Sequence, residues 1–287
     1  MRAWIKPRIW PWVSGTVLAC CGFAAQAACP DISLMQNAAR GWIAGQRLPD
    51  PLVWNLQDAQ CAYDSFRGVL QAEMGPAVGV KVGFTSVEVQ RRFGIDAPIA
   101  GALFGPMLRA DGSKLSLTGS RNPVYEADLV VTVGSSDIMQ ARTREDVVAA
   151  LKDVRPFIEL PDLAFAHGVA PTAPLMAAYG VTPWRGVLGK GVAIGELADP
   201  VNDLAAMAVV LRVDGKPVGT SRGAALLGNP LDVVLWLVGQ GGYELKPGSI
   251  ISLGSFGTYG PAQPGMRLEA EYNLAGRVMK VGTALVP

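Results

Sequence analysis

One stretch near the middle of the chain, residues 125–133 with the sequence YEADLVVTV, limits the possible folds most strongly. Its β-branched and apolar residues predict a buried strand, yet Glu126 and Asp128 lie two positions apart within it. Side chains at positions i and i+2 of a strand point to one face, with Cα atoms about 6–7 Å apart. Two carboxylates that close repel each other unless a cation lies between them. The fold must therefore expose this face to solvent or bring a cation to it.

A third carboxylate, Glu159, stands in another apolar segment, FIELPD. The chain between Asp128 and Glu159 is long enough for the end of one strand, a helix and a return strand. This spacing predicts two neighbouring strands that bring the three acids together. Three oxygen ligands suit Mg²⁺, Mn²⁺ or Ca²⁺ better than a soft metal. The alternative is that Glu126 and Asp128 form the solvent face of an alternating strand, which is where acids usually lie.

The first 27 residues have the pattern of an export signal. Basic residues precede an apolar run, and Ala25-Gln26-Ala27 supplies the small residues of a cleavage site. We therefore expect residues 1–27 to be a cleaved signal peptide. The mature protein is then expected in the periplasm, with no attachment to the membrane. The alternative is an uncleaved anchor, but the apolar run is shorter than the roughly 20 residues that a spanning helix needs.

The cysteines agree with export. Cys20 and Cys21 lie inside the apolar run and leave with the signal, although acylation of one of them is a further alternative. Cys29 and Cys61 remain, an even pair in an oxidising compartment, and we predict that they form a disulfide. The alternative is two separate buried thiols. The sequence has a single histidine and no Cys/His cluster, so a zinc site with soft ligands is not expected.

Length and composition allow one large domain or two modest ones, with a substantial core and many turns. Half of the 287 residues are hydrophobic, and Gly 34 and Pro 21 are counts typical of short strands. The net charge of +1, without a basic face, gives no support to nucleic-acid binding.

The pattern of apolar residues divides the mature chain into a helical N-terminal region, residues 28–78, and a β-rich domain, residues 79–287. Short β segments with few helices predict an α+β fold, a mixed β-roll or sandwich. We expect a loop over residues 95–108 and a helix that begins after Thr143 and ends at Pro156. Hairpin turns are expected at Asp214-Gly215 and Ala275-Gly276, and a helix is expected to begin after Asn229.

Five stretches, in order, resemble the fumarylacetoacetate hydrolase superfamily, and within it the branch of 2-keto-4-pentenoate hydratases and 4-oxalocrotonate decarboxylases. These stretches are KVGFTSVEVQRRFGIDAPIAGALF, YEADLVVTVG, RPFIELPD, RGAALLGNPLDVVLWLVGQ and LKPGSIISLGSFGTYGPAQPGMRLEAEYNLAGRV. They run from Lys81 almost to the end of the chain. The resemblance implies the β-roll of the superfamily's C-terminal domain, preceded by a helical region, and assembly into a homo-oligomer.

The resemblance also implies a site. It assigns Mg²⁺ or Mn²⁺ to Glu126, Asp128 and Glu159, and a small 2-oxo or 2-hydroxy carboxylate as the ligand of that metal. Lys81 matches a lysine that lies near the substrate in the superfamily, and Asp162 is the candidate to orient a water molecule. The matching stretches supply four candidates for substrate binding: Thr85, Ser86, Gly223 and Ser255.

The implied activity is that of a hydratase-like lyase that works through an enolate of a 2-hydroxydienoic or 2-oxo acid. Several positions depart from the family pattern. Asp128 replaces the usual Glu, Leu163-Ala164 replaces Ser-Arg, and Asn229 replaces the histidine of LGHP. The segment APTAPLMAAYGVTPWRG also replaces a loop rich in Asp and Asn. A decarboxylase, an acylpyruvate hydrolase and a non-catalytic periplasmic carboxylate-binding protein therefore remain as alternatives.

Overall fold

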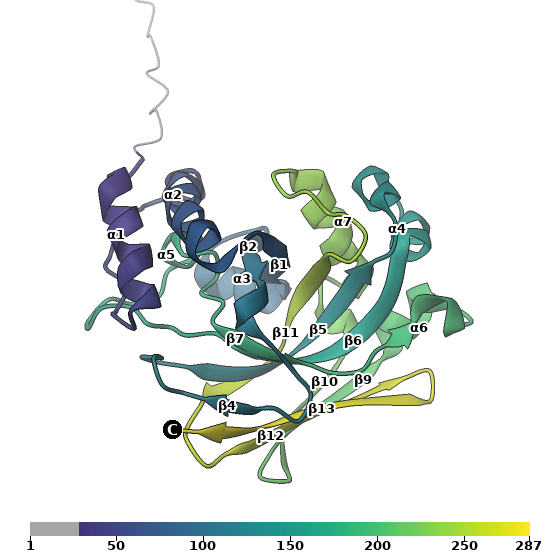
Figure 1. Cartoon of the computed structure of the whole chain (residues 1–287). Helices are drawn as coiled ribbons and strands as arrows, with labels where there is room; N and C mark the ends of the chain where they lie inside the picture. Colours follow the sequence, from purple (N-terminus) through teal and green to yellow (C-terminus); the bar gives the residue numbers. More distant parts are fainter. Residues whose placement is uncertain (1–28) are drawn as a thin grey trace, which may run out of the picture.

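A computed structural model describes residues 29–287, and its centre is an eight-stranded sheet that curls over a smaller sheet (Figure 1). The expected signal peptide lies outside the described residues. Strands along the larger sheet follow the order β2 (Ile99–Phe104), β1 (Ala77–Gly83), β11 (Ile250–Pro261), β5 (Val124–Val133), β6 (Leu151–Leu160), β7 (Arg185–Leu188) and β3 (Leu108–Ala110), with β8 (Val192–Ala193) beside β6.

The smaller sheet has five strands and packs against one face of the larger sheet. Their facing apolar side chains form the main core, which includes Leu129 of the larger sheet and Tyr272 of the smaller one. Both predicted hairpin turns are confirmed, and the residues of each turn have positive φ, as a two-residue hairpin requires. The strand order is β10 (Lys216–Arg222), β9 (Ala208–Val213), β12 (Arg267–Leu274), β13 (Arg277–Val286) and β4 (Lys114–Ser116).

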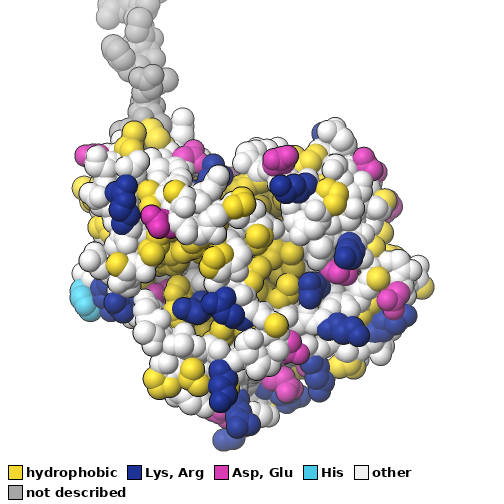
Figure 2. All heavy atoms as spheres, in the orientation of Figure 1, with side chains coloured by type: hydrophobic (Ala, Val, Ile, Leu, Met, Phe, Trp, Pro, Cys, Tyr) yellow, Lys and Arg dark blue, Asp and Glu magenta, His cyan; other side chains and the backbone are white. Residues whose placement is uncertain are grey.

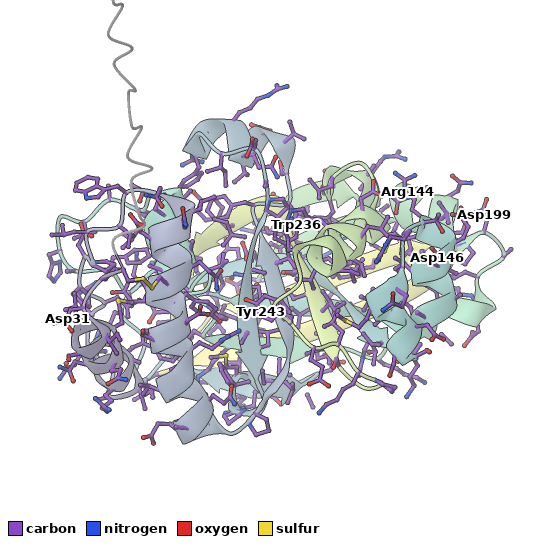
Figure 3. All side chains as sticks on the ribbon, turned by 90° about the horizontal axis from the view of Figure 1, so that it is seen from above. Asp31, Arg144, Asp146, Asp199, Trp236 and Tyr243 are labelled. Carbon is purple, nitrogen blue, oxygen red and sulfur yellow. A yellow bond between two sulfur atoms is a disulfide. The ribbon has the colours of Figure 1, made fainter. Side chains whose placement is uncertain are left out.

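The opposite face of the larger sheet is covered at one end by α1 (Ile32–Ile43), α2 (Leu56–Met74) and α5 (Ala173–Ala178) (Figure 1). A second core joins these helices to the sheet, with Phe66 and Tyr179 on the helical side and Phe157 on the sheet. The disulfide predicted between Cys29 and Cys61 is confirmed, with a Cα–Cα distance of 5.5 Å. It lies beside α2, and Figure 3 shows it close to the labelled Asp31.

The remaining helices lie at the other end of the sheet, except for α3, which follows β1. Thr143 caps α4 (Arg144–Ala150) through a capping box with Asp146, and Asn229 caps α7 (Pro230–Gln240) by accepting a hydrogen bond from the amide of Leu231. Arg144 and Asp232 then join α4 to α7 through paired bonds of 2.6 and 2.7 Å. These helices are α3 (Val87–Phe93), α4 (Arg144–Ala150), α6 (Pro200–Ala206) and α7 (Pro230–Gln240), with short 3₁₀ turns η1 (Gly105–Met107), η2 (Ser136–Gln140), η3 (Ile194–Glu196) and η4 (Gly223–Ala225).

Two local predictions are wrong. Residues 95–108 are not a loop, because β2 lies within them as the edge strand that pairs with β1. The helix after Thr143 ends at Ala150, and Pro156 lies inside β6. Proline is tolerated there because it lies between the parts of β6 that pair with β7 and with β8, where a missing N–H breaks no ladder bond. Its carbonyl still accepts a hydrogen bond from the amide of Gly189.

The α+β architecture with a helical N-terminal region agrees with the sequence-based expectation. The boundary expected at residue 78 stays a prediction, although α1 and α2 both precede it. Within residues 29–287, no helix is both long and apolar enough to cross a membrane. The molecular surface is hollowed between the N-terminal helices and the helices around α7, and hydrophobic side chains line the hollow (Figure 2).

Candidate metal centre

The three predicted acids meet on β5 and β6. The antiparallel register places Glu126 directly opposite Glu159, and Asp128 opposite Phe157. One carboxylate oxygen from each of Glu126, Asp128 and Glu159 lies within 4.8 Å of the others. Asp128 and Glu159 are buried, whereas the side chain of Glu126 keeps 14% of its surface exposed. The cluster is therefore reached from solvent past Glu126.

The alternation of β5 explains why the acids share a face. Ala127, Leu129 and Val131 point into the main core between the two sheets, so Glu126 and Asp128 must point to the opposite face. Most of that face is not open to water, because the second core packs on it next to the acids, around Val130 and Phe157. The alternative of a solvent-exposed acidic face is therefore wrong for Asp128, which is 0% exposed.

Lys81 brings a positive charge to the cluster from β1. Its Nζ lies 3.1 Å from Oε1 of Glu159 and 3.7 Å from Oε1 of Glu126. The ammonium also donates a hydrogen bond of 3.2 Å to the carbonyl of Val181. Burial by itself lowers the pKa of Lys81, but the neighbouring carboxylates outweigh burial and hold the pKa above its usual value. The side chain is therefore a buried, charged ammonium.

Burial raises the pKa of two of the three acids. Burial raises the pKa of Asp128 to about 7, and the charge of Glu126 adds to that effect while Ser252 opposes it. Burial also raises the pKa of Glu159 well above its usual range, against the opposing charge of Lys81. Three ionised carboxylates and one ammonium leave a net charge of −2, which one divalent cation would neutralise.

The hydrogen bonds of the acids test whether such a cation fits. Asp128 is held by Ser252 Oγ at 2.7 Å, by the amide of Gly254 at 2.9 Å and by the amide of Leu129. No described residue donates a hydrogen bond of good geometry to either oxygen of Glu159, although Oε1 lies beside Lys81. Buried oxygens without donors are rare and need an explanation. The donor set consists of hard oxygens and therefore fits Mg²⁺ or Mn²⁺.

Tyr272 supports the cluster from the smaller sheet, a role that the sequence did not indicate. Its buried hydroxyl lies 2.5 Å from the carbonyl oxygen of Asp128 and 3.1 Å from that of Phe157. The phenol therefore ties β12 to the two strands that carry the acids.

Tyr272→Phe is expected to destabilise the protein by about 1–3 kcal/mol, because the single O–H donor that two buried carbonyls share is lost. Urea unfolding monitored by circular dichroism measures this loss. The control is Tyr259→Phe, because Tyr259 is 53% exposed, so the loss of its hydroxyl leaves no buried group without a donor. Equal stabilities of the two variants would contradict the assigned role of Tyr272.

Asp162, predicted to orient water, lies apart from the cluster of three acids. Its carboxylate accepts hydrogen bonds from the amides of Arg121 at 2.9 Å and Asn122 at 2.6 Å. These bonds fix the chain just before β5. The catalytic role of Asp162 stays a prediction, and the geometry gives it a structural role in addition.

Two of the predicted substrate-binding residues border the cluster. Ser255 is the β11 partner of Asp128. Thr85 packs against Gly254, where an added methyl group would lie 2.1 Å from the Thr85 hydroxyl. Ser86 is half-buried at the start of α3, and Gly223 packs instead against the carbonyl of Leu204 in α6.

Tyr259 also borders the acids, and the sequence analysis missed it. The register of β11 and β5 pairs Tyr259 with Glu126, after two irregularities that displace the strand. Thr258, the preceding residue, lines a small cavity with Ala127 on the far face, so Tyr259 points to the face of the acids. Gly257, with φ of 92°, is the sequence signal that could have indicated this bulge.

A known family and several known proteins resemble this chain in sequence. The model of the fumarylacetoacetate (FAA) hydrolase C-terminal family matches residues 96–284, which include all three acids. The 2-keto-4-pentenoate hydratase of Paraburkholderia xenovorans (strain LB400) is 31% identical over 212 residues, covering 70% of this chain and 74% of that protein. The 2-hydroxyhexa-2,4-dienoate hydratase of Comamonas testosteroni is 32% identical over 201 residues, covering 67% and 73%.

Solved structures show the same fold. The 4-oxalocrotonate decarboxylase from Pseudomonas putida G7, complexed with magnesium and adipate, superposes with a TM-score of 0.77 at 22% identity, covering 89% of this chain and 97% of that one. The fumarylpyruvate hydrolase from Pseudomonas aeruginosa, in complex with Mn²⁺ and pyruvate, gives a TM-score of 0.54 at 16% identity, covering 72% and 88%. The family model, the related hydratases and the shared fold agree, and the chain belongs to the fumarylacetoacetate hydrolase family.

Proposed function

We propose that this protein is a metal-dependent hydratase of a small 2-hydroxydienoic or 2-oxo acid. The observation that carries the proposal is the convergence of Glu126, Asp128 and Glu159, with the ammonium of Lys81 3.1 Å from Glu159. The hydratases among its relatives support the choice of reaction, since they match about two thirds of the chain or more.

Glu126, Asp128 and Glu159 would hold Mg²⁺ or Mn²⁺, in keeping with the metals in the related solved structures. When bound, the cation supplies Lewis-acid stabilisation of the negative charge that develops on the carboxylate and 2-oxygen of the substrate. Asp128 is the most rigid of the three ligands, because Ser252 and Gly254 already hold both of its oxygens. Glu126 faces the open side, where the substrate would enter.

Lys81 would stabilise and protonate the substrate. Its ammonium is buried and charged, and it lies at the edge of the cluster formed by Glu126 and Glu159. From there it can donate a hydrogen bond to the developing enolate and a proton to the dienol carbon chain. The proton that the adding water releases as its oxygen bonds to carbon then restores the ammonium. Thr85 and Ser255, which border the acids, are placed to orient the bound acid.

The test is an assay of the purified mature protein with 2-hydroxypenta-2,4-dienoate. We expect the dienol absorbance to disappear with added Mg²⁺ or Mn²⁺ and to persist after treatment with a chelator. Metal binding shown by calorimetry, with no loss of absorbance, would exclude hydratase activity on this substrate. Turnover of 4-oxalocrotonate or of an acylpyruvate instead would favour a decarboxylase or an acylpyruvate hydrolase. Binding of a 2-oxo acid without turnover of any of these compounds would favour a non-catalytic carboxylate-binding protein.

Lys81→Met is expected to lower kcat by about 10²-fold, because a proton donor beside the substrate is lost. The same change removes a positive charge that repels a cation, so the affinity for Mn²⁺ should stay equal or increase. Calorimetry with Mn²⁺ and steady-state kinetics separate these effects. Lys81→Arg is the matched variant, since it retains the charge but not the shape of the ammonium. A loss of Mn²⁺ binding in Lys81→Met would contradict this role.

We also propose that the mature protein works in the periplasm as a homo-oligomer. The disulfide between Cys29 and Cys61 supports an oxidising compartment. Fractionation of cells that express the full chain tests the location, and light scattering on the mature protein tests the assembly. Recovery of the uncleaved chain in the cytoplasm, or a monomer in solution, would contradict the respective part.

A further inference from the structure

Three consecutive residues after α5 have a left-handed backbone. The φ angles of Gly180, Val181 and Thr182 are 59°, 62° and 50°. Glycine adopts this conformation freely and ends α5 in the usual way, with its amide bonded to Ala177 and the next amide bonded to Met176. Val181 and Thr182 are β-branched, and for such residues the left-handed region costs free energy. The end of α5 requires only Gly180 to be left-handed. Another contact must therefore hold Val181 and Thr182 in the left-handed region.

Two glycines beside Lys81 form the seat of this turn. Gly101 is the cross-strand partner of Lys81, and Gly83 follows two positions after Lys81 on the same face of β1. A methyl group added at Gly83 would lie 2.5 Å from Cγ1 of Val181. A methyl group at Gly101 would lie 2.0 Å from the carbonyl oxygen of Gly180. The turn therefore occupies the space that side chains on either side of Lys81 would fill.

The conformation brings a carbonyl to the ammonium. Val181 O accepts a hydrogen bond of 3.2 Å from Lys81 Nζ. Thr182 O accepts a bond of 3.2 Å from the amide of Asp162, which fixes the far end of the turn. With Glu159 at 3.1 Å and Glu126 at 3.7 Å, the ammonium has three oxygen neighbours for its three N–H groups.

We propose that the turn Gly180–Thr182 positions Lys81. The carbonyl of Val181 holds the ammonium at the edge of the acid cluster, and the left-handed backbone is the arrangement that presents this carbonyl while the turn lies flat on Gly83 and Gly101. Val181 is thus a positioning residue that acts through Lys81. The holding of Lys81 stands on the geometry alone, whereas its consequence for turnover rests on the proposed function.

The experiment displaces the turn and then restores its fit. Gly83→Ala places a methyl group against Cγ1 of Val181 and should push the turn away. Adding Val181→Ala removes the colliding methyl groups of Val181. In the double variant the methyl group of residue 83 therefore fills the space that they leave. The readout is the rate at which a small acylating reagent modifies Lys81 in the metal-free, full-length mature protein, measured by peptide mass spectrometry. Gly105→Ala is the control, since an added methyl group there makes only an ordinary contact, 3.7 Å from Val78.

We expect slow acylation of Lys81 in the wild type and the control, and a rate about tenfold higher in Gly83→Ala, because release of the ammonium exposes it. The double variant should return to within about threefold of the wild type. If Gly83→Ala does not fold, Val181→Gly decides, because it cannot collide with Gly83 and it removes the buried side chain that packs the turn against β1. The loss of this packing outweighs the relief of backbone strain, so acylation should again rise about tenfold. Unchanged acylation in the displaced variant, or no recovery in the double variant, would overturn the proposal.

Kinetics then separate positioning from general damage. In Gly83→Ala, kcat should fall about tenfold while KM and the dissociation constant for Mn²⁺ stay within about threefold, because the carboxylates on β5 and β6 do not move. A parallel loss of Mn²⁺ affinity would show damage to the sheet and would count against a role limited to Lys81. If the wild type has no turnover, the proposed function fails, and acylation still decides whether the turn holds Lys81.

Discussion

Glu126→Ala is expected to abolish detectable Mg²⁺ and Mn²⁺ binding and to lower the hydratase rate by about 10³-fold, which corresponds to about 4 kcal/mol of transition-state stabilisation. The metal loses one of three carboxylates, and the charge that balances a divalent cation falls with it. Glu126 is the best of the three acids for this test because its side chain is the one with 14% exposure. Its truncation should therefore leave the fold intact.

The measurements are Mn²⁺ titration by calorimetry, thermal unfolding with and without metal, and the dienol assay. In the wild type, added metal should raise the melting temperature; in Glu126→Ala, the metal-free and metal-loaded proteins should melt together. Glu269→Ala is the matched control, because Glu269 is an exposed acid on β12 of the smaller sheet. Unchanged affinity for Mn²⁺ in Glu126→Ala would refute the three-carboxylate site, whatever the assay shows.

The acid cluster could be predicted because its elements obey short-range rules. The two-residue period of β5 sets Glu126 and Asp128 on one face, and the apolar residues between them fix which face is buried. The return strand then needs only the correct register to place Glu159 opposite Glu126. Each step depends on residues close together in the sequence or on a single strand pairing.

The supports of the cluster could not be predicted in this way. Ser252 reaches Asp128 across a sequence separation of 124, and Tyr272 reaches the same residue across 144. Neither is unusual in its own segment, because a serine or tyrosine in an amphipathic strand is common. Their role arises only when β11 and the smaller sheet pack against β5.

The prediction of a loop at residues 95–108 failed for a related reason. Glycine and proline there suggested turns, but Gly101 lies inside β2. A glycine is required at this position because the turn after α5 leaves no room for a side chain. A glycine required by the close approach of another chain segment has the same sequence signal as a glycine in a loop. The same ambiguity concealed the seat of the turn beside Lys81.

Removal of the disulfide is expected to have the largest effect on stability. The variant with Cys29→Ser and Cys61→Ser should lose about 3–4 kcal/mol, because the bond closes a loop with a sequence separation of 32 and restricts the unfolded chain. The bond joins the start of α1 to α2, and α1 contributes Met35, Ala38 and Ala39 to the second core. Without it, the N-terminal helix should separate more readily from the sheet.

Thermal unfolding of the mature protein measures this loss, which should lower the melting temperature by roughly 10 °C. The wild type treated with dithiothreitol is the matched control and should melt with the double variant, whereas the variant itself should not respond to dithiothreitol. The acid cluster lies on β5 and β6 rather than on α1 or α2, so the folded variant should retain its affinity for Mn²⁺. Two free thiols in exported, unreduced protein would show that Cys29 and Cys61 do not pair, and the proposal of a periplasmic enzyme would then lose its structural support.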